Sequence, residues 1–151
     1  MSGHHRVPHD QAQSLAERVA ERMFDSDRAS RALGMTIERV SPGSATLAMI
    51  VRSDMVNGHA ICHGGFIFTL ADSAFAFACN SYNFNTVAQG CSIDYLAPAQ
   101  EGDTLTANAH ERSLSGRTGV YDIDVTNQRG ETIALFRGKS YRIKGHIVEG
   151  L

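Results

Sequence analysis

The sequence predicts an α+β domain in which an antiparallel sheet wraps around one buried helix. Residues 65–82 form an apolar, alanine-rich run that is too long for one strand, which favours a buried helix. Short alternating segments joined by turn signals surround this run, and this pattern is typical of antiparallel sheets. The 151 residues suit a single domain, 1–151, that buries its own core.

The segment before the buried helix contains an amphipathic helix and two strands. Residues 10–32 carry apolar side chains at spacings of four with charges between them, and Asp10 is a plausible N-cap. Strands are expected at 35–40 and 45–51, with "SPGS" as the turn between them. The polar loop "RSDMVNGHAICHGG" (52–65) follows, and loops of this length in compact domains tend to carry function.

The chain after the buried helix is expected to be β-structure. Alternating segments at 86–97, 104–114, 116–128 and 132–144 are separated by turn signals such as "PAQEGD" and "RGE". Consecutive strands joined by short turns predict a four-stranded meander.

Composition narrows the class of protein. The 14 basic and 16 acidic residues form no basic stripe, so nucleic acid is not expected as a partner. We expect no signal peptide and no membrane-spanning segment, and therefore a cytoplasmic location. An odd number of cysteines, three, argues against a disulfide framework.

Asp72 is the one charge inside the apolar run. It falls roughly two turns inside the predicted helix, too deep to act as a cap. An unpaired buried carboxylate is costly, and carboxylates placed in this way are more often functional, although structural ion pairs give the same pattern. We interpret Asp72 as a functional carboxylate.

The sequence "CHGG" precedes this helix. A helix N-terminus carries unsatisfied N–H groups and positive partial charge, and glycine lets another group approach the backbone closely. Gly64 and Gly65 therefore suit an oxyanion clamp, although two glycines before a helix can equally be a tight turn.

Spacing separates the two features. Gly64 and Asp72 are eight residues apart, or roughly 12 Å along one helix. One helix cannot bring both to one carbonyl, whereas two antiparallel copies can. We therefore expect the site to lie across a two-fold homodimer interface.

Other polar residues of the loop are open to more than one interpretation. Asn57 can orient water or a carbonyl, but "NG" is first a turn signal. His63 can shape the loop or act as a base, and we favour loop shaping. His59, Cys62 and His63 lack a fourth ligand nearby, so no metal site is expected.

The segments "CHGGFIFTLADSAFAFACNS", "CSIDYLAPAQEGDTLTANA" and "TGVYDIDVTNQRGETIALFRGKSYRI" resemble the hotdog-fold acyl-CoA thioesterases, in particular the phenylacetate-degradation (PaaI-type) thioesterases. The resemblance covers about residues 22–145, so the predicted N-terminal helix begins before this core and extends beyond what the family needs. It implies a curved sheet around the long helix, and dimers that often stack into homotetramers. It also implies aryl- or hydroxyphenylacetyl-CoA substrates and no cofactor, because coenzyme A is part of the substrate.

By the same resemblance, Asp72 is the nucleophile or the base that activates water. The partner subunit's Gly64 N–H polarises the thioester carbonyl, Asn57 positions water or the carbonyl, and His63 shapes the loop. The remaining residues implied for substrate binding lie around the site and along the CoA arm, and are Gly65, Thr69, Ser73, Arg117, Thr118, Arg137 and Lys139.

Two alternatives remain open. A hotdog hydratase or dehydratase would use a His–acid pair, for which His63 and Asp72 could serve. A non-catalytic acyl-CoA sensor would use the fold for binding alone and would not need Asp72.

Overall fold

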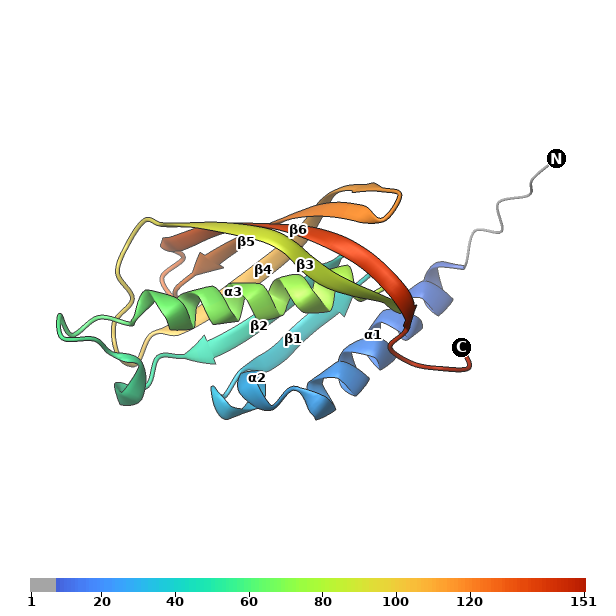
Figure 1. Ribbon diagram of the computed structural model, residues 1–151. Helices are drawn as coiled ribbons and strands as arrows, with labels where there is room; N and C mark the ends of the chain where they lie inside the picture. The colour runs from blue at the N-terminus through green and yellow to red at the C-terminus, as the bar shows by residue number, and fades with distance from the viewer. Residues whose placement is uncertain (1–7) are drawn as a thin grey trace.

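The computed structural model describes residues 8–151 and has the expected α+β architecture, with one antiparallel sheet curved around a long helix (Figure 1). The elements, in chain order, are α1 (His9–Ser26), α2 (Arg28–Ala32), β1 (Thr36–Ser41), β2 (Ser44–Ile50), the 3-10 turn η1 (Ser53–Met55), α3 (Gly64–Cys79), β3 (Phe84–Tyr95), β4 (Thr104–Ser115), β5 (Thr118–Thr126) and β6 (Thr132–His146).

The order of strands in the sheet is β1-β2-β4-β5-β6-β3, so the predicted four-stranded meander is wrong. Of the four strands of the predicted meander, only β4, β5 and β6 lie side by side in chain order. β3 pairs with β6 rather than with β4, and β4 pairs with β2. The chain leaves β2, runs along α3 and returns as β3 at the far edge of the sheet (Figure 1). Alternation predicts that a segment is a strand, but it does not identify the neighbouring strand.

The predicted helix 10–32 is interrupted at Asp27, whose φ of −85° and ψ of 86° are not helical. The Asp27 carboxylate accepts a hydrogen bond from the Ser30 backbone N–H at 3.0 Å, and so caps a second short helix. The predicted cap at Asp10 is wrong, since Pro8 precedes α1 and Asp10 lies in its first turn.

The buried helix begins one residue earlier than predicted, at Gly64, and ends at Cys79 rather than at residue 82. The side chain of Asn80 stops it by bonding both to the carbonyl of Ala76 and to the backbone of Thr86. This amide links the end of α3 to the first residues of β3.

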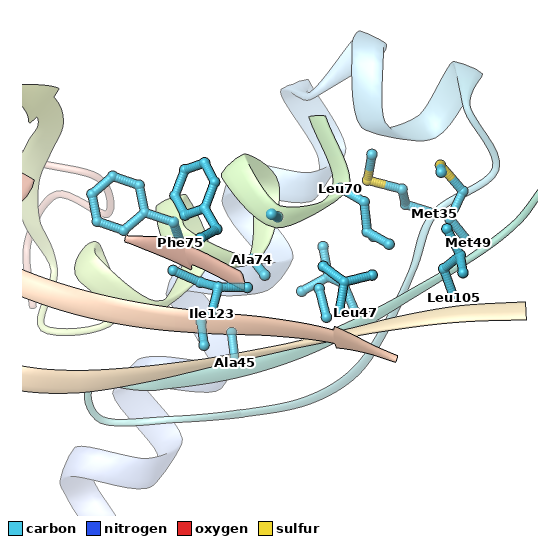
Figure 2. Packing of buried hydrophobic residues seen from close by; sticks show 14 of the residues in the cluster. Met35, Ala45, Leu47, Met49, Leu70, Ala74, Phe75, Leu105 and Ile123 are labelled. Carbon is cyan, nitrogen blue, oxygen red and sulfur yellow. The ribbon is translucent and has the colours of Figure 1, made fainter. Parts of the chain in front are cut away.

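The core lies between α3 and the concave face of the sheet (Figure 2). Leu70, Ala74 and Phe75 of α3 pack towards Leu47 of β2 and Ile123 of β5. This contact fixes the rotation of α3 about its axis, and therefore the direction in which its one carboxylate points. Within residues 8–151, no helix combines the length and apolar character needed to cross a bilayer.

Candidate active site

The carboxylate of Asp72 projects from the middle of α3 and is half-buried. Burial raises the pKa of the Asp72 carboxyl above its usual value, and the negative charge of Asp27 raises it further. Burial also raises the pKa values of the Cys79 and Cys91 thiols, and the charge of Asp72 adds to both. The Asp72 carboxylate therefore lies within electrostatic reach of Asp27 before α2, of Cys79 at the end of α3 and of Cys91 in β3. A raised pKa makes the ionised carboxylate a stronger base and nucleophile.

A chain of hydroxyl bonds connects the turn between α1 and α2 to the residue after Asp72. The Ser30 hydroxyl donates to the Asp27 carboxylate at 2.6 Å, and lies 2.8 Å from the Ser73 hydroxyl. Because Ser30 has one hydroxyl proton and gives it to Asp27, Ser73 donates to Ser30. Ser73 is 8% exposed. Its expected role in substrate binding stays a prediction, and its hydroxyl proton is used within the chain.

The glycine end of α3 is capped by His63. The ring Nδ1 of His63 accepts a hydrogen bond from the Gly65 N–H at 3.4 Å. The backbone N–H of His63 donates to the Met55 carbonyl at 2.7 Å. This geometry favours loop shaping over a role as a base. Within residues 8–151, the Gly64 N–H forms no hydrogen bond, so it is available to a ligand.

Tyr95, the last residue of β3, closes one side of this end. Its hydroxyl donates to the Gly64 carbonyl at 2.8 Å. A cavity of about 520 Å³ lies beside it, and is lined by Asn57, Gly64, Tyr95 and the mostly apolar residues Ile61, Cys62, Ile67, Leu96, Ala97, Pro98 and Ala99. The cavity therefore borders the N-terminal end of α3.

Asn57 organises the loop that covers this cavity. Its side-chain oxygen accepts the His59 N–H at 2.9 Å and the Ile61 N–H at 3.4 Å, and its backbone N–H donates to the Ile61 carbonyl. These contacts form the turn that was the alternative interpretation of Asn57. Its amide nitrogen makes no bond within residues 8–151, and a role in positioning water stays a prediction.

The aromatic side chains of α3 and of the segment after it differ in their exposure. Phe75 is 1% exposed and belongs to the core, and the Tyr82 hydroxyl donates to Glu111 at 2.9 Å. Phe66 and Phe68 are half-buried, with part of each ring open beside α3.

The other predicted binding residues do not gather at one place. Thr69 lies one turn from Gly65 and donates its hydroxyl proton to the Gly65 carbonyl. Arg117 lies at the β4–β5 turn and lines a cavity of about 170 Å³ beyond the C-terminal end of α3, and Thr118 is the first residue of β5.

Arg137 and Lys139 lie on the face of the sheet opposite α3, where Arg137 holds Asp122 through two bonds of 2.7 and 2.9 Å. Within one chain they are on the other side of the sheet from Asp72. All four residues stay predictions.

Metal and thiol chemistry gain no support. Among residues 8–151, no three side chains of the metal-binding types His, Cys, Asp and Glu come together. Burial raises the pKa of the Cys62 thiol to about 11, so this residue is a neutral thiol near pH 7 and a weak nucleophile.

Comparison with known proteins identifies the family. The family model for the thioesterase superfamily matches residues 59–134. The chain is 51% identical over 128 residues to the acyl-coenzyme A thioesterase PaaI of Escherichia coli, which covers 85% of this chain and 91% of that protein. The chain belongs to the hotdog-fold thioesterases. The expected family, fold and enzyme class, a thioester hydrolase, are confirmed.

Solved structures of this family match the whole fold. The E. coli PaaI protein, from the phenylacetic acid degradation operon, superposes with a TM-score of 0.88 and 48% identity, over 89% of this chain and 98% of that one. A hypothetical thioesterase of Streptococcus pneumoniae solved with coenzyme A has a TM-score of 0.76 and 26% identity, over 85% and 98%. Acyl-coenzyme A thioesterase 13 of Homo sapiens is 30% identical over 129 residues, 83% of this chain and 91% of that protein.

Two residues near the thioesterase site were not found from the sequence. Tyr95 belongs to a segment that resembles the family, but nothing in a period-2 pattern indicates that a strand-end hydroxyl reaches a helix N-terminus. Asp27 falls inside the predicted helix 10–32, where no role was expected for it. The spacing of Asp27 and Ser30 is that of a helix cap, and this signal could have located the break.

Proposed function

We propose that this thioesterase hydrolyses acyl-CoA thioesters, with aryl- or hydroxyphenylacetyl-CoA as the favoured substrates, to the free acid and CoA. The observation that carries the proposal is the half-buried Asp72, the only charge on α3, whose pKa is raised. Similarity to E. coli PaaI supports the acyl-CoA class and the phenylacetyl group. The streptococcal relative solved with coenzyme A supports binding of the CoA part.

The proposed reaction uses a clamp and a carboxylate. The Gly64 N–H donates to the thioester oxygen and stabilises the negative charge that develops when the carbonyl is attacked. The ionised Asp72 either attacks the carbonyl carbon or removes a proton from the attacking water. The C–S bond then breaks and CoA leaves as the thiolate. Attack by water gives the free acid directly, whereas attack by Asp72 gives a mixed anhydride, which a water molecule hydrolyses to the free acid and the Asp72 carboxylate. Asn57 would orient the water or the carbonyl, and His63 would hold the clamp loop.

A second copy of the chain is part of the proposal. Within one helix, Gly64 and Asp72 are roughly 12 Å apart, which is too far to serve one carbonyl. The edge strand β3 is 12 residues long, is exposed on both faces and carries one charged residue, Asp94. A long edge strand with a single charge is suited to pairing with another strand.

Two-fold pairing of β3 with its copy would lay the two α3 helices side by side in opposite directions. Each Asp72 would then approach the partner subunit's glycine end. A homotetramer built from two such dimers, and a cytoplasmic location, stay predictions.

The CoA arm would follow the basic residues. Arg117 at the β4–β5 turn is the better placed candidate for the phosphates, because it lines a cavity together with Cys79 at the C-terminal end of α3, and Thr118 is the next residue in the chain. Arg137 and Lys139 could reach the same arm only from the outer face, for example across an interface between dimers.

Release of free thiol from a panel of acyl-CoA thioesters tests the proposal, with wild type, Asp72→Asn and Asp25→Asn compared. Asp25 is an exposed carboxylate of α1, away from β3, and serves as the matched control. We expect turnover by wild type and Asp25→Asn, with phenylacetyl-CoA among the best substrates, and a loss of about 10²- to 10⁴-fold in Asp72→Asn.

Other outcomes would decide between the alternatives. Double-bond chemistry without thiol release would indicate a hydratase, and binding without turnover would indicate a sensor. Incorporation of labelled water into the enzyme in a single turnover would distinguish attack by Asp72 from activation of water.

A further inference from the structure

Tyr95 contacts the glycine clamp through both parts of its side chain. The hydroxyl donates to the Gly64 carbonyl at 2.8 Å. The ring lies over the Gly64 Cα, so that a Cβ added at this position would be 3.0–3.3 Å from three atoms of the phenol. The close approach of the ring therefore favours glycine at this position, as does the approach of any ligand.

The phenol is also a wall of the cavity that leads to the clamp. Tyr95 is 50% exposed although its hydroxyl is bonded, and the cavity of about 520 Å³ runs along its ring to Gly64. A tyrosine that packed only for stability would be more buried. Here the exposed part of the ring borders the space where a thioester would lie.

We infer that Tyr95 is a positioning residue of the oxyanion clamp, which holds the first turn of α3 in place and sets how the thioester meets it. This inference rests on the proposed function, because it names a residue that acts on the clamp of that reaction. Tyr95 acts through the backbone of α3 and transfers no proton to the substrate.

Two physical effects support this role. The first turn of a helix is its least constrained part, and a bond from a separate strand restricts its motion. The Gly64 carbonyl belongs to the same peptide unit as the Gly65 N–H. A bond to that carbonyl polarises the unit and strengthens the bond from the Gly65 N–H to His63, which holds the clamp loop against the helix. Burial raises the pKa of the Tyr95 phenol, and Cys62 raises it further, so the hydroxyl keeps its proton at neutral pH.

The test compares Tyr95→Phe, which removes only the hydroxyl, with Tyr141→Phe, the same change on the exposed outer face of β6. Thiol release from phenylacetyl-CoA gives kcat and KM for each. We expect Tyr95→Phe to lower kcat by about 3- to 10-fold, the worth of one neutral hydrogen bond, with KM within about 2-fold of wild type. Tyr141→Phe should leave both unchanged.

Coupling to the clamp provides a second readout. In a Gly64→Pro background, which lacks the N–H, the Tyr95→Phe change should have little further effect on kcat. An equal loss in both backgrounds would overturn the inference, as would an effect on KM alone or a loss of kcat that follows the loss of folded protein.

Failure of the inference and failure of the proposed function can be told apart. If wild type releases thiol and Asp72→Asn does not, but Tyr95→Phe keeps the wild-type kcat, only the role of Tyr95 is wrong. If wild type releases no thiol from any acyl-CoA, the proposed function itself is wrong.

Discussion

Two substitutions of Gly64 separate the effect of its N–H on kcat from the effect of its missing side chain. One replaces Gly64 with alanine and the other replaces it with proline. Alanine keeps the N–H and adds a Cβ, which would lie 3.0 Å from the Tyr95 Cζ. Ordinary contact begins near 3.4 Å, so the ring must retreat by about 0.4 Å. Because the ring is half exposed, it has room to do so.

The expected cost of alanine follows from that shift. The hydroxyl bond to the Gly64 carbonyl, 2.8 Å long, would stretch to about 3.2 Å, somewhat beyond the normal range for an O–H···O bond. The loss in kcat should therefore not exceed that of Tyr95→Phe, about 3- to 10-fold.

Proline adds the same Cβ and also removes the N–H. The helix should tolerate it, since Gly64 is the first residue of α3 and the preceding His63 has φ −61° and ψ 132°, a conformation compatible with a following proline. Loss of one oxyanion donor should lower kcat by about 10²- to 10³-fold, well beyond the loss in alanine. The assay is thiol release at saturating acyl-CoA, with thermal unfolding measured in parallel. Equal kcat values for two folded variants would refute the assignment of the Gly64 N–H as the clamp.

Three further predictions concern stability and pH. Asp72→Asn should raise the thermal unfolding midpoint at pH 7, because a pKa that is raised in the folded state means that ionisation of Asp72 opposes folding. This gain should vanish below the unfolded pKa of 3.8, and a gain that is independent of pH would contradict the prediction. Asp27→Asn can still cap α2 but removes the negative charge beside Asp72, so it should lower the pKa of Asp72 and move the acid limb of the kcat/KM profile to lower pH. An acid limb that does not move would contradict this prediction. Gly138→Ala should lower the free energy of unfolding, measured by urea titration, by about 1–3 kcal/mol, because the added Cβ would lie 2.7 Å from the Phe75 ring. Gly90→Ala is the control, and it should leave the free energy of unfolding unchanged because no atom lies within 4 Å of the added Cβ.

The helix α3 could be predicted from the sequence because the signals that indicate it are local. An apolar run with one carboxylate, preceded by two glycines, requires only helical periodicity for its interpretation, and the structure places Gly64 and Asp72 on α3 as expected. The distance between them followed from the rise per residue alone.

The pairing of β3 could not be predicted in the same way. β3 pairs with β6 in a register that joins Phe84 to His146, and no local pattern encodes a contact at that separation. The contacts of Ser73 and Tyr95 depend on the same tertiary arrangement, since their hydroxyls reach elements distant in sequence.

The central claim is that each site combines Asp72 of one subunit with the partner's Gly64, and subunit mixing tests it most directly. Asp72→Asn and Gly64→Pro proteins are each nearly inactive in this account. After exchange in equal amounts, half of the dimers are mixed, and each mixed dimer has one intact site. Thiol release should then recover to about one quarter of the wild-type rate. If subunit exchange is demonstrated and the rate stays at the mean of the two parents, the shared site is wrong.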